Sequence, residues 1–162
     1  MAGVTEHQTV TTAAGQVFQA TVVLYDPQVD IAVLYVPGLN LPVLHFAGQA
    51  NPSDNAVVAG YPLDAQTLQA APARIGGIQD VQGLNIYQDS TVTRQIYEIR
   101  ADVRSGNSGG PLLSPAGTVD GVVFAAAIGV QDTGFALTAA EVSADANAGA
   151  GDTAPVSTMG CD

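Results

Sequence analysis

Short runs of β-branched and aromatic residues recur along the whole chain, and turn-forming segments such as "DPQ", "NPSD" and "SPAG" separate them. Valine, isoleucine, threonine, tyrosine and phenylalanine favour strands, whereas proline, glycine, asparagine and aspartate favour turns. The predicted strands cover residues 16–25, 31–36, 42–46, 56–61, 73–78, 91–101, 110–113, 118–128 and 134–138. Residues 139–148 are the one helix candidate. This spacing, without a long amphipathic helix, predicts an all-β antiparallel barrel or sandwich.

The balance of charge restricts the partners of the chain. Its 162 residues carry a formal net charge of −11, with no lysine and four positive side chains, all arginine. Nucleic-acid binding depends on cations that neutralise phosphates, and anionic membranes attract basic surfaces, so neither is an expected partner. The longest apolar run, 121–130, is about half of a membrane span. The polar start "MAGVTEHQTV" has no hydrophobic region of the kind that signal peptides need.

The segment "RSGNSGGPLL", residues 104–113, has the features of a nucleophile loop. Gly106, Gly109 and Gly110 permit positive φ and leave room for the close approach of a substrate. A sharp bend would direct the N–H groups of Gly106 and Ser108 into one pocket, where two donors stabilise a developing oxyanion. Ser108 is then the candidate nucleophile. The alternative is an ordinary loop of glycine and serine between two strands.

With the strand "QIYEIRADV" before it and "GTVDGVVFAAA" and "TGFAL" after it, "GNSGGPLL" resembles the second barrel of a trypsin-like serine protease of the bacterial HtrA-like branch. The resemblance covers residues 2–148 and is nearest to a mycobacterial, membrane-anchored protease linked to acid resistance. It implies a chymotrypsin-like fold of two six-stranded antiparallel β-barrels. Residues 1–70 would form the first barrel without its N-terminal strands, 71–148 the second barrel and 149–162 a tail.

Asn107 differs from the residue that digestive trypsins have in the same motif. Those enzymes carry an aspartate there, which pairs with a newly cut N-terminus during activation. An asparagine cannot form that ion pair. The resemblance therefore implies a loop that does not need this activation step.

The segment "YDPQVDIAVLYV" resembles the aspartate strand of the family, with Asp30 in the place of the triad aspartate and Asp26 in the turn before it. An aspartate in that role accepts a hydrogen bond from imidazole Nδ1 and stabilises the imidazolium. A single aspartate at the start of a strand is otherwise a solvated edge residue, but the apolar run after Asp30 favours the catalytic interpretation. The segment "NAVVAGYPL", residues 55–63, resembles the family's Gly-Tyr-Pro turn and supports this register.

Neither of the two histidines matches the base of the family. His45 follows "LPVL" at a variable position, and His7 lies in a polar segment expected to be a turn. In the family the base belongs to an Asn-Ala-His segment, and "MAGVTEHQTV" resembles the residues that follow that segment. The base is therefore expected upstream of residue 1. The first barrel would then have an unpaired edge, and this form of the chain would be inactive or severely impaired.

The residues before the nucleophile are expected to line the substrate pocket. Asp102 lies six residues before Ser108, the spacing at which trypsin-like enzymes place the acid that selects arginine or lysine. An equally weighted alternative is a structural ion pair of Asp102 with Arg100 or Arg104. The opposite wall would consist of Phe124, Ala125, Ala126 and Ala127. Its small alanines leave room for a sizeable side chain.

These features favour a serine endopeptidase that acts on peptide or protein substrates; by resemblance, it would be extracytoplasmic and membrane-tethered in its full-length form. A protein-binding module on the same scaffold is the second hypothesis, although such a module would not need an oxyanion loop. A different acyl hydrolase is disfavoured, because Gly-x-Ser-x-Gly elbows precede a helix whereas Ser108 precedes a strand. No metal or other cofactor is expected. Cys161 is either a free thiol or the disulfide partner of an upstream cysteine.

Overall fold

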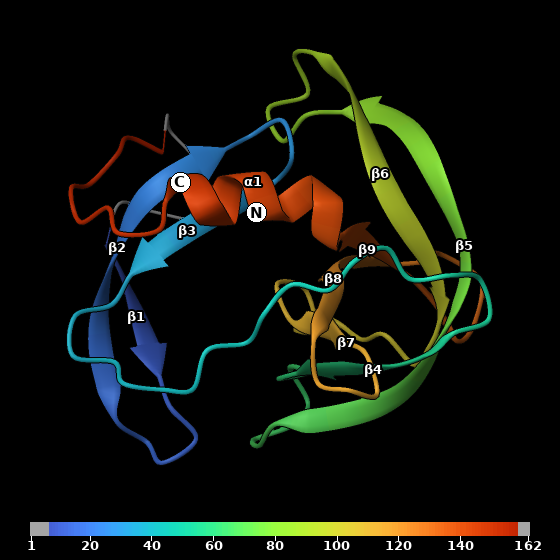
Figure 1. The fold of residues 1–162 in the computed structure, drawn as a ribbon, viewed down its shortest axis with the longest axis horizontal. Coiled ribbons are helices and arrows are strands. Elements are labelled where there is room, and N and C mark those ends of the chain that lie inside the picture. Colours follow the sequence, from blue (N-terminus) through green and yellow to red (C-terminus); the bar gives the residue numbers. More distant parts are fainter. Residues whose placement is uncertain (1–6, 159–162) are drawn as a thin grey trace. The chain divides into compact units, whose positions relative to one another are not determined.

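The computed structural model describes residues 7–158, which form nine strands and one helix (Figure 1). The chain divides into two compact units. Unit 1 comprises residues 1–42, 82–92 and 143–162, and unit 2 comprises residues 43–81 and 93–142. The prediction of a mostly β protein with one short helix is confirmed.

Unit 1 contains a three-stranded antiparallel sheet in the order β1-β2-β3. These strands are β1 (His7–Thr11), β2 (Val17–Asp26) and β3 (Ile31–Tyr35). The pairing of β2 with β3 shifts between Val22 and Leu24, which marks a bulge. Val22 and Val23 are both buried at this point, because the bulge interrupts the alternation of faces along β2.

Six strands close into a barrel in the order β4-β5-β6-β9-β8-β7, and β7 pairs back with β4 (Figure 1). The strands are β4 (Asn55–Gly60), β5 (Gln69–Leu84), β6 (Thr91–Arg100), β7 (Pro111–Leu113), β8 (Val119–Ala126) and β9 (Thr133–Thr138). Closure pairs the strand edges that an open sheet would leave exposed.

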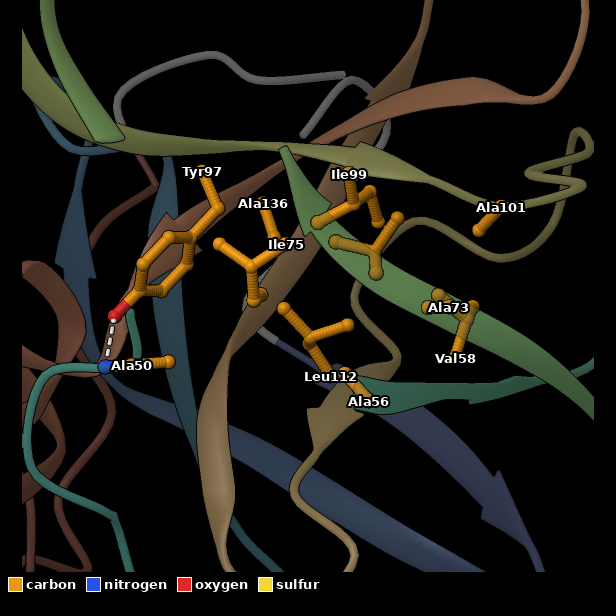
Figure 2. Close-up of a cluster of buried hydrophobic side chains, with 11 residues drawn as sticks. Ala50, Ala56, Val58, Ala73, Ile75, Tyr97, Ile99, Ala101, Leu112 and Ala136 are labelled. Atoms are coloured by element: carbon orange, nitrogen blue, oxygen red, sulfur yellow. Dashed lines mark hydrogen bonds between the residues drawn. The ribbon is translucent and has the colours of Figure 1, made fainter. Parts of the chain in front are cut away.

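The barrel interior is filled by small and branched apolar side chains together with one tyrosine (Figure 2). Tyr97, Ile99, Leu112 and Val123 are 0% exposed. The Tyr97 hydroxyl accepts a hydrogen bond from the Ala50 N–H at 2.9 Å, so its polar end has a partner inside the core. This bond also attaches the segment before β4 to the barrel.

The helix α1 (Ala139–Ala148) covers the residues predicted for it. Thr138 caps its first turn, because its Oγ1 accepts the N–H of Glu141 at 3.2 Å. The Glu141 carboxylate in turn accepts the backbone N–H of Gln95 on β6 at 3.1 Å. Within residues 7–158, no helix is both long enough and apolar enough to cross a membrane.

Three local predictions are wrong. Residues 42–46 form no strand and make only a single bridge, between Phe46 and Val119. Val43 in this segment is 76% exposed, so its apolar composition does not reflect burial. The polar segment that starts at His7 is strand β1 rather than a turn. The predicted strand 73–78 extends to Gln69–Leu84, because pairing with neighbouring strands overrides the interruption by proline and glycine.

The segment after α1, predicted as a tail, forms neither helix nor strand in residues 149–158 but packs within unit 1, to which it belongs. The Val156 N–H donates to the Val22 carbonyl at 3.0 Å. The Tyr87 hydroxyl donates to the Thr158 carbonyl at 2.8 Å, and Thr158 is buried. Cys161 lies outside the described residues.

Replacing Tyr97 with phenylalanine should lower the free energy of unfolding by about 1–3 kcal/mol, because the buried Ala50 N–H loses its acceptor while the ring stays in place. Urea unfolding monitored by circular dichroism measures this loss. The matched control is Tyr61→Phe, since Tyr61 is 46% exposed. An equal loss in both variants would contradict the role of the hydrogen bond.

Candidate active site

Residues 104–110 form two consecutive tight turns between β6 and β7. The Asn107 N–H donates to the Arg104 carbonyl and the Gly110 N–H donates to the Asn107 carbonyl, both at 2.9 Å. Gly106 and Gly109 adopt φ values of 97° and 83°, in the left-handed region that favours glycine. The glycines of the motif thus supply the bend that the sequence predicts.

The loop backbone lies directly against the segment that follows β4. A Cβ on Gly106 would fall on the Tyr61 carbonyl oxygen and lie 2.8 Å from the Leu63 nitrogen. A Cβ on Gly110 would likewise fall on the Ala59 carbonyl oxygen. The Leu63 N–H donates to the Ser105 carbonyl at 2.9 Å. Close packing therefore requires glycine at both positions, and at Gly106 the positive φ requires it as well.

Asn107 is buried beneath the loop, with 3% of its surface exposed. Its Oδ1 accepts the Arg104 N–H at 2.8 Å. Its Nδ2 packs against Gly60, where an added Cβ would lie only 2.8 Å from that nitrogen. The amide of Asn107 thus fixes the start of the loop from inside the protein by a neutral hydrogen bond.

Ser108 is exposed at the top of the loop. Its Oγ donates a hydrogen bond to the Phe124 carbonyl at 3.1 Å. The β8–β9 pairing shifts between Val123 and Ala125, so Phe124 has no partner in the ladder and its carbonyl can face the serine. On the neighbouring residue, Val123 accepts the Gly109 N–H at 2.8 Å and donates to the Gly110 carbonyl at 2.9 Å.

The N–H groups of Gly106 and Ser108 donate no hydrogen bond to the described residues 7–158. Both belong to exposed residues of the loop. Two donors without a protein acceptor can hydrogen-bond a ligand carbonyl that approaches the serine hydroxyl.

Asp102 lies in an ion pair rather than alone. Its Oδ2 is 3.4 Å from Nε of Arg104, and Nη1 of the same arginine is 2.8 Å from Oδ2 of Asp64. The side chain of Asp102 is 63% exposed. The structure therefore contains the ion pair with Arg104 that one of the two interpretations of Asp102 predicts.

Of the residues predicted for the opposite wall of the pocket, Phe124, Ala125 and Ala126 belong to β8, and Ala127 follows it. The ring of Phe124 lies 6.4 Å from the ring of Phe135, measured between centroids, at a tilt of 34°. Ala125 pairs with Phe135 and Ala126 pairs with Gly134. These residues therefore continue the strand whose bulge carries the carbonyl bonded to Ser108.

Asp30 belongs to unit 1, at the end of the turn between β2 and β3. Its N–H donates to the Asp26 carbonyl at 3.0 Å, and its φ is 73°. The Asp26 carboxylate accepts the N–H groups of Gln28 and Val29, so Asp26 organises the turn as the sequence predicts. Asp30 is half-buried immediately before β3.

His7 lies in unit 1 and His45 lies in unit 2. His7 is the first residue of β1. His45 is exposed, and its carbonyl accepts the Val119 N–H at 2.8 Å.

Sequence reasoning did not find the Phe124 carbonyl as the partner of Ser108, because a bulge leaves no pattern in the residue types. The close contact with Tyr61 had a signal in the "GYP" turn.

The model of the trypsin-like peptidase domain matches residues 2–122, and the chain therefore belongs to this family. Its two sheets correspond to a chymotrypsin-like double β-barrel that lacks some strands.

Among its relatives, serine protease Rv3671c (MarP) of Mycobacterium tuberculosis is 49% identical over 151 residues, which cover 92% of this chain and 38% of that protein. A periplasmic DegP-like serine endoprotease of Chlamydia pneumoniae is 32% identical over 133 residues, 79% of this chain and 26% of that protein. The crystal structure of the active form of the Mycobacterium tuberculosis protease superimposes with a TM-score of 0.88 at 49% identity, covering 94% of this chain and 67% of that one. The chain thus spans well under half the length of these curated relatives.

Replacing Gly106 with alanine should destabilise unit 2 by about 3 kcal/mol or more, because overlap with the Tyr61 carbonyl adds to the cost of a positive φ. Gly109→Ala is the matched control: its φ is also positive, but nothing lies within 4 Å of an added Cβ. It should cost about 1–2 kcal/mol. Chemical unfolding of both variants measures the difference, and equal losses would contradict the packing requirement.

Proposed function

We propose that this chain carries the nucleophile, the oxyanion donors and the orienting acid of a serine endopeptidase. Ser108 is the nucleophile, the N–H groups of Gly106 and Ser108 are the oxyanion donors, and Asp30 is the orienting acid. One observation carries the proposal: an exposed serine hydroxyl on a glycine-bent loop beside two N–H groups that donate to no described residue. Membership of the trypsin-like peptidase family supports the same reaction class.

In this mechanism, Oγ of Ser108 leaves the Phe124 carbonyl and attacks the carbonyl carbon of a peptide bond. An imidazole takes the hydroxyl proton and later gives it to the leaving amine, while the carboxylate of Asp30 holds the imidazole in the correct tautomer. The carbonyl oxygen becomes an oxyanion that accepts hydrogen bonds from Gly106 and Ser108. Water then attacks the acyl-enzyme and regenerates the serine.

Neither His7 nor His45 is the base in this proposal, because neither matches the family's Asn-Ala-His segment. The 162-residue polypeptide by itself is therefore proposed to be severely impaired. Losing one member of a triad leaves only the contribution of the oxyanion donors and of substrate binding, about 10³–10⁴-fold over water.

The proposed substrate is a peptide segment of a protein outside the cytoplasm, cleaved by a parent protein tethered to the membrane. The periplasmic relative from Chlamydia pneumoniae supports the compartment. In the proposed pocket, Phe124, Ala125 and Ala126 form one wall and Asp102 lies on the other side. The ion pair with Arg104 limits how strongly Asp102 can attract a basic substrate side chain.

A fluorophosphonate probe tests the nucleophile and the base together. A chain extended upstream by the family's Asn-Ala-His segment should be labelled at Ser108, and the 162-residue chain should be labelled more slowly by about 10⁴-fold or more. Mass spectrometry of the labelled peptide identifies the residue.

Three variants sharpen this experiment. Ser108→Ala in the extended chain should abolish labelling, and Asp30→Asn should slow peptide hydrolysis by about 10⁴-fold. Rapid labelling of the 162-residue chain that disappears in His7→Ala would overturn the assignment of the base. Unchanged hydrolysis by Ser108→Ala would remove the proposed activity altogether.

Asp102→Asn in the extended chain tests the pocket. Because Asp102 is exposed and already paired, the ratio of kcat/KM for peptides with arginine and with leucine before the cleaved bond should change by less than about threefold. A fall of that ratio by about a hundredfold would instead show that Asp102 selects basic residues.

A further inference from the structure

Unit 2 contains a cavity of about 380 Å³ that shares no lining residue with the Ser108 loop. It is lined by the segment 47–50, by Asp54 and the first residue of β4, by three residues of the turn between β7 and β8, and by Asp120 on β8. The cavity therefore lies between the segment that precedes β4 and the hairpin formed by β7 and β8.

Hydrogen bonds fix the walls of this cavity. The segment before β4 runs beside β8, because Val119 donates to the His45 carbonyl and accepts the Ala47 N–H, both at 2.8 Å. The Ala50 N–H is bound by the Tyr97 hydroxyl inside the core. Ser114 and Thr118 face each other across the hairpin, with hydroxyl oxygens 2.7 Å apart. The cavity is thus formed before any ligand arrives.

Two carboxylates line the cavity, and one of them is buried. Asp120 is only 4% exposed, yet its side chain makes no hydrogen bond or ion pair within residues 7–158. Asp54 is exposed and uses Oδ2 to accept the Asn51 N–H at 2.8 Å. The oxygens of Asp120 are not fully enclosed, so this largely desolvated carboxylate is open to a ligand that enters the cavity, and an opposite charge there would offset the cost of its burial.

No charged group near the cavity neutralises Asp120 within residues 7–158. Burial raises the pKa of Asp120, and the negative charge of Asp54 raises it further. Burial also raises the pKa of Tyr97, the hydrogen bond from Ala50 opposes that shift, and Asp120 and Asp54 add to it. Arg74, which pairs with Asn55 across β4 and β5, donates its Nε to the Ser53 carbonyl at 3.0 Å and forms no ion pair within the described residues.

The chemistry of the lining favours an organic cation over a metal ion. Within residues 7–158, no group of three or more His, Cys, Asp or Glu side chains is arranged to hold a metal. The lining instead combines two carboxylates and two hydroxyls with the methyl and ring carbons of Ala47, Ala50 and Pro115. A planar guanidinium on an aliphatic stem matches both parts, because its fork pairs with carboxylates and its stem packs on apolar atoms.

We propose that this cavity binds a guanidinium group, held by Asp120 and Asp54, with the hydroxyl of Thr118 as a further acceptor; the Ser114 hydroxyl already accepts the Ala116 and Thr118 N–H groups. The group can come from an arginine side chain of a peptide or from a free guanidine. The site is separate from the proposed peptidase centre, so its existence does not depend on catalysis by Ser108.

Isothermal titration of the 162-residue chain with agmatine and with the peptide acetyl-Gly-Arg-Gly-amide tests the proposal. Both probes should bind saturably at one site. A matched peptide with citrulline in place of arginine should not bind, because it has the same shape without the charge. Peptide binding about tenfold tighter than agmatine binding would identify the arginine of a peptide as the ligand, and equal binding would identify the free guanidine.

Variants assign the site. Asp120→Asn should weaken agmatine binding by about tenfold or more, and Asp54→Asn by a smaller factor. Asp120→Asn should stay folded, because it removes a buried charge whose ionisation opposes folding. Asp80→Asn, the same change at an exposed position on β5, should leave binding unaltered.

Four results would overturn the proposal. They are no saturable binding of either arginine probe, equal binding of the citrulline peptide, equal loss in Asp80→Asn and Asp120→Asn, and stoichiometric Ca²⁺ binding without agmatine binding. None of them bears on the labelling of Ser108, so the two proposals fail separately.

Discussion

The loop of residues 104–110, which carries the proposed nucleophile, depends on the direct contact between its backbone and two carbonyl groups at and just after the end of β4. Gly106 lies against the Tyr61 carbonyl and Gly110 against the Ala59 carbonyl, with no space for a side chain at either position. These two contacts therefore fix both ends of the bend, and the direction of the intervening N–H groups follows from them. A larger residue would have to move the loop, the strand end or both.

The closed barrel makes this contact rigid. β4 pairs with β5 on one side and with β7 on the other, and β7 begins one residue after Gly110. The loop thus leaves and rejoins the same closed sheet, and Asn107 fills the space beneath it. On the opposite side, the bulge in β8 presents the Phe124 carbonyl to Ser108. The loop that carries Ser108 is held against strands on both sides, which favours precise geometry.

Much of this arrangement could be predicted from residue types. The Ser108 loop was predicted because glycine is needed for its φ values, and the turn before Asp30 because aspartate and proline favour turns. The helix 139–148 was found within the same bounds. Strand β1 was missed because its polar residues show no apolar alternation, and 42–46 was overpredicted because exposed Val43 looks like a core residue.

The cavity around Asp120 could not be predicted from the sequence either. Its only signal is one acid inside the apolar run that forms β8, and such a residue is equally compatible with an exposed edge. Asp120 becomes a candidate ligand only through its burial and the proximity of Asp54, the residue before β4, and both depend on contacts between segments far apart in the chain. Local patterns do not report such contacts, nor the bulge that places the Phe124 carbonyl.

The hydrogen bond from Ser108 to Phe124 has a consequence for reactivity. A hydroxyl whose proton rests on an amide oxygen meets an incoming electrophile as an ordinary alcohol, with no enhancement of its nucleophilicity. Any imidazole must first compete with that amide, and the serine must rotate about its Cα–Cβ bond. In the proposed mechanism, the bulge in β8 therefore holds the Ser108 hydroxyl on the Phe124 carbonyl until a base replaces that acceptor.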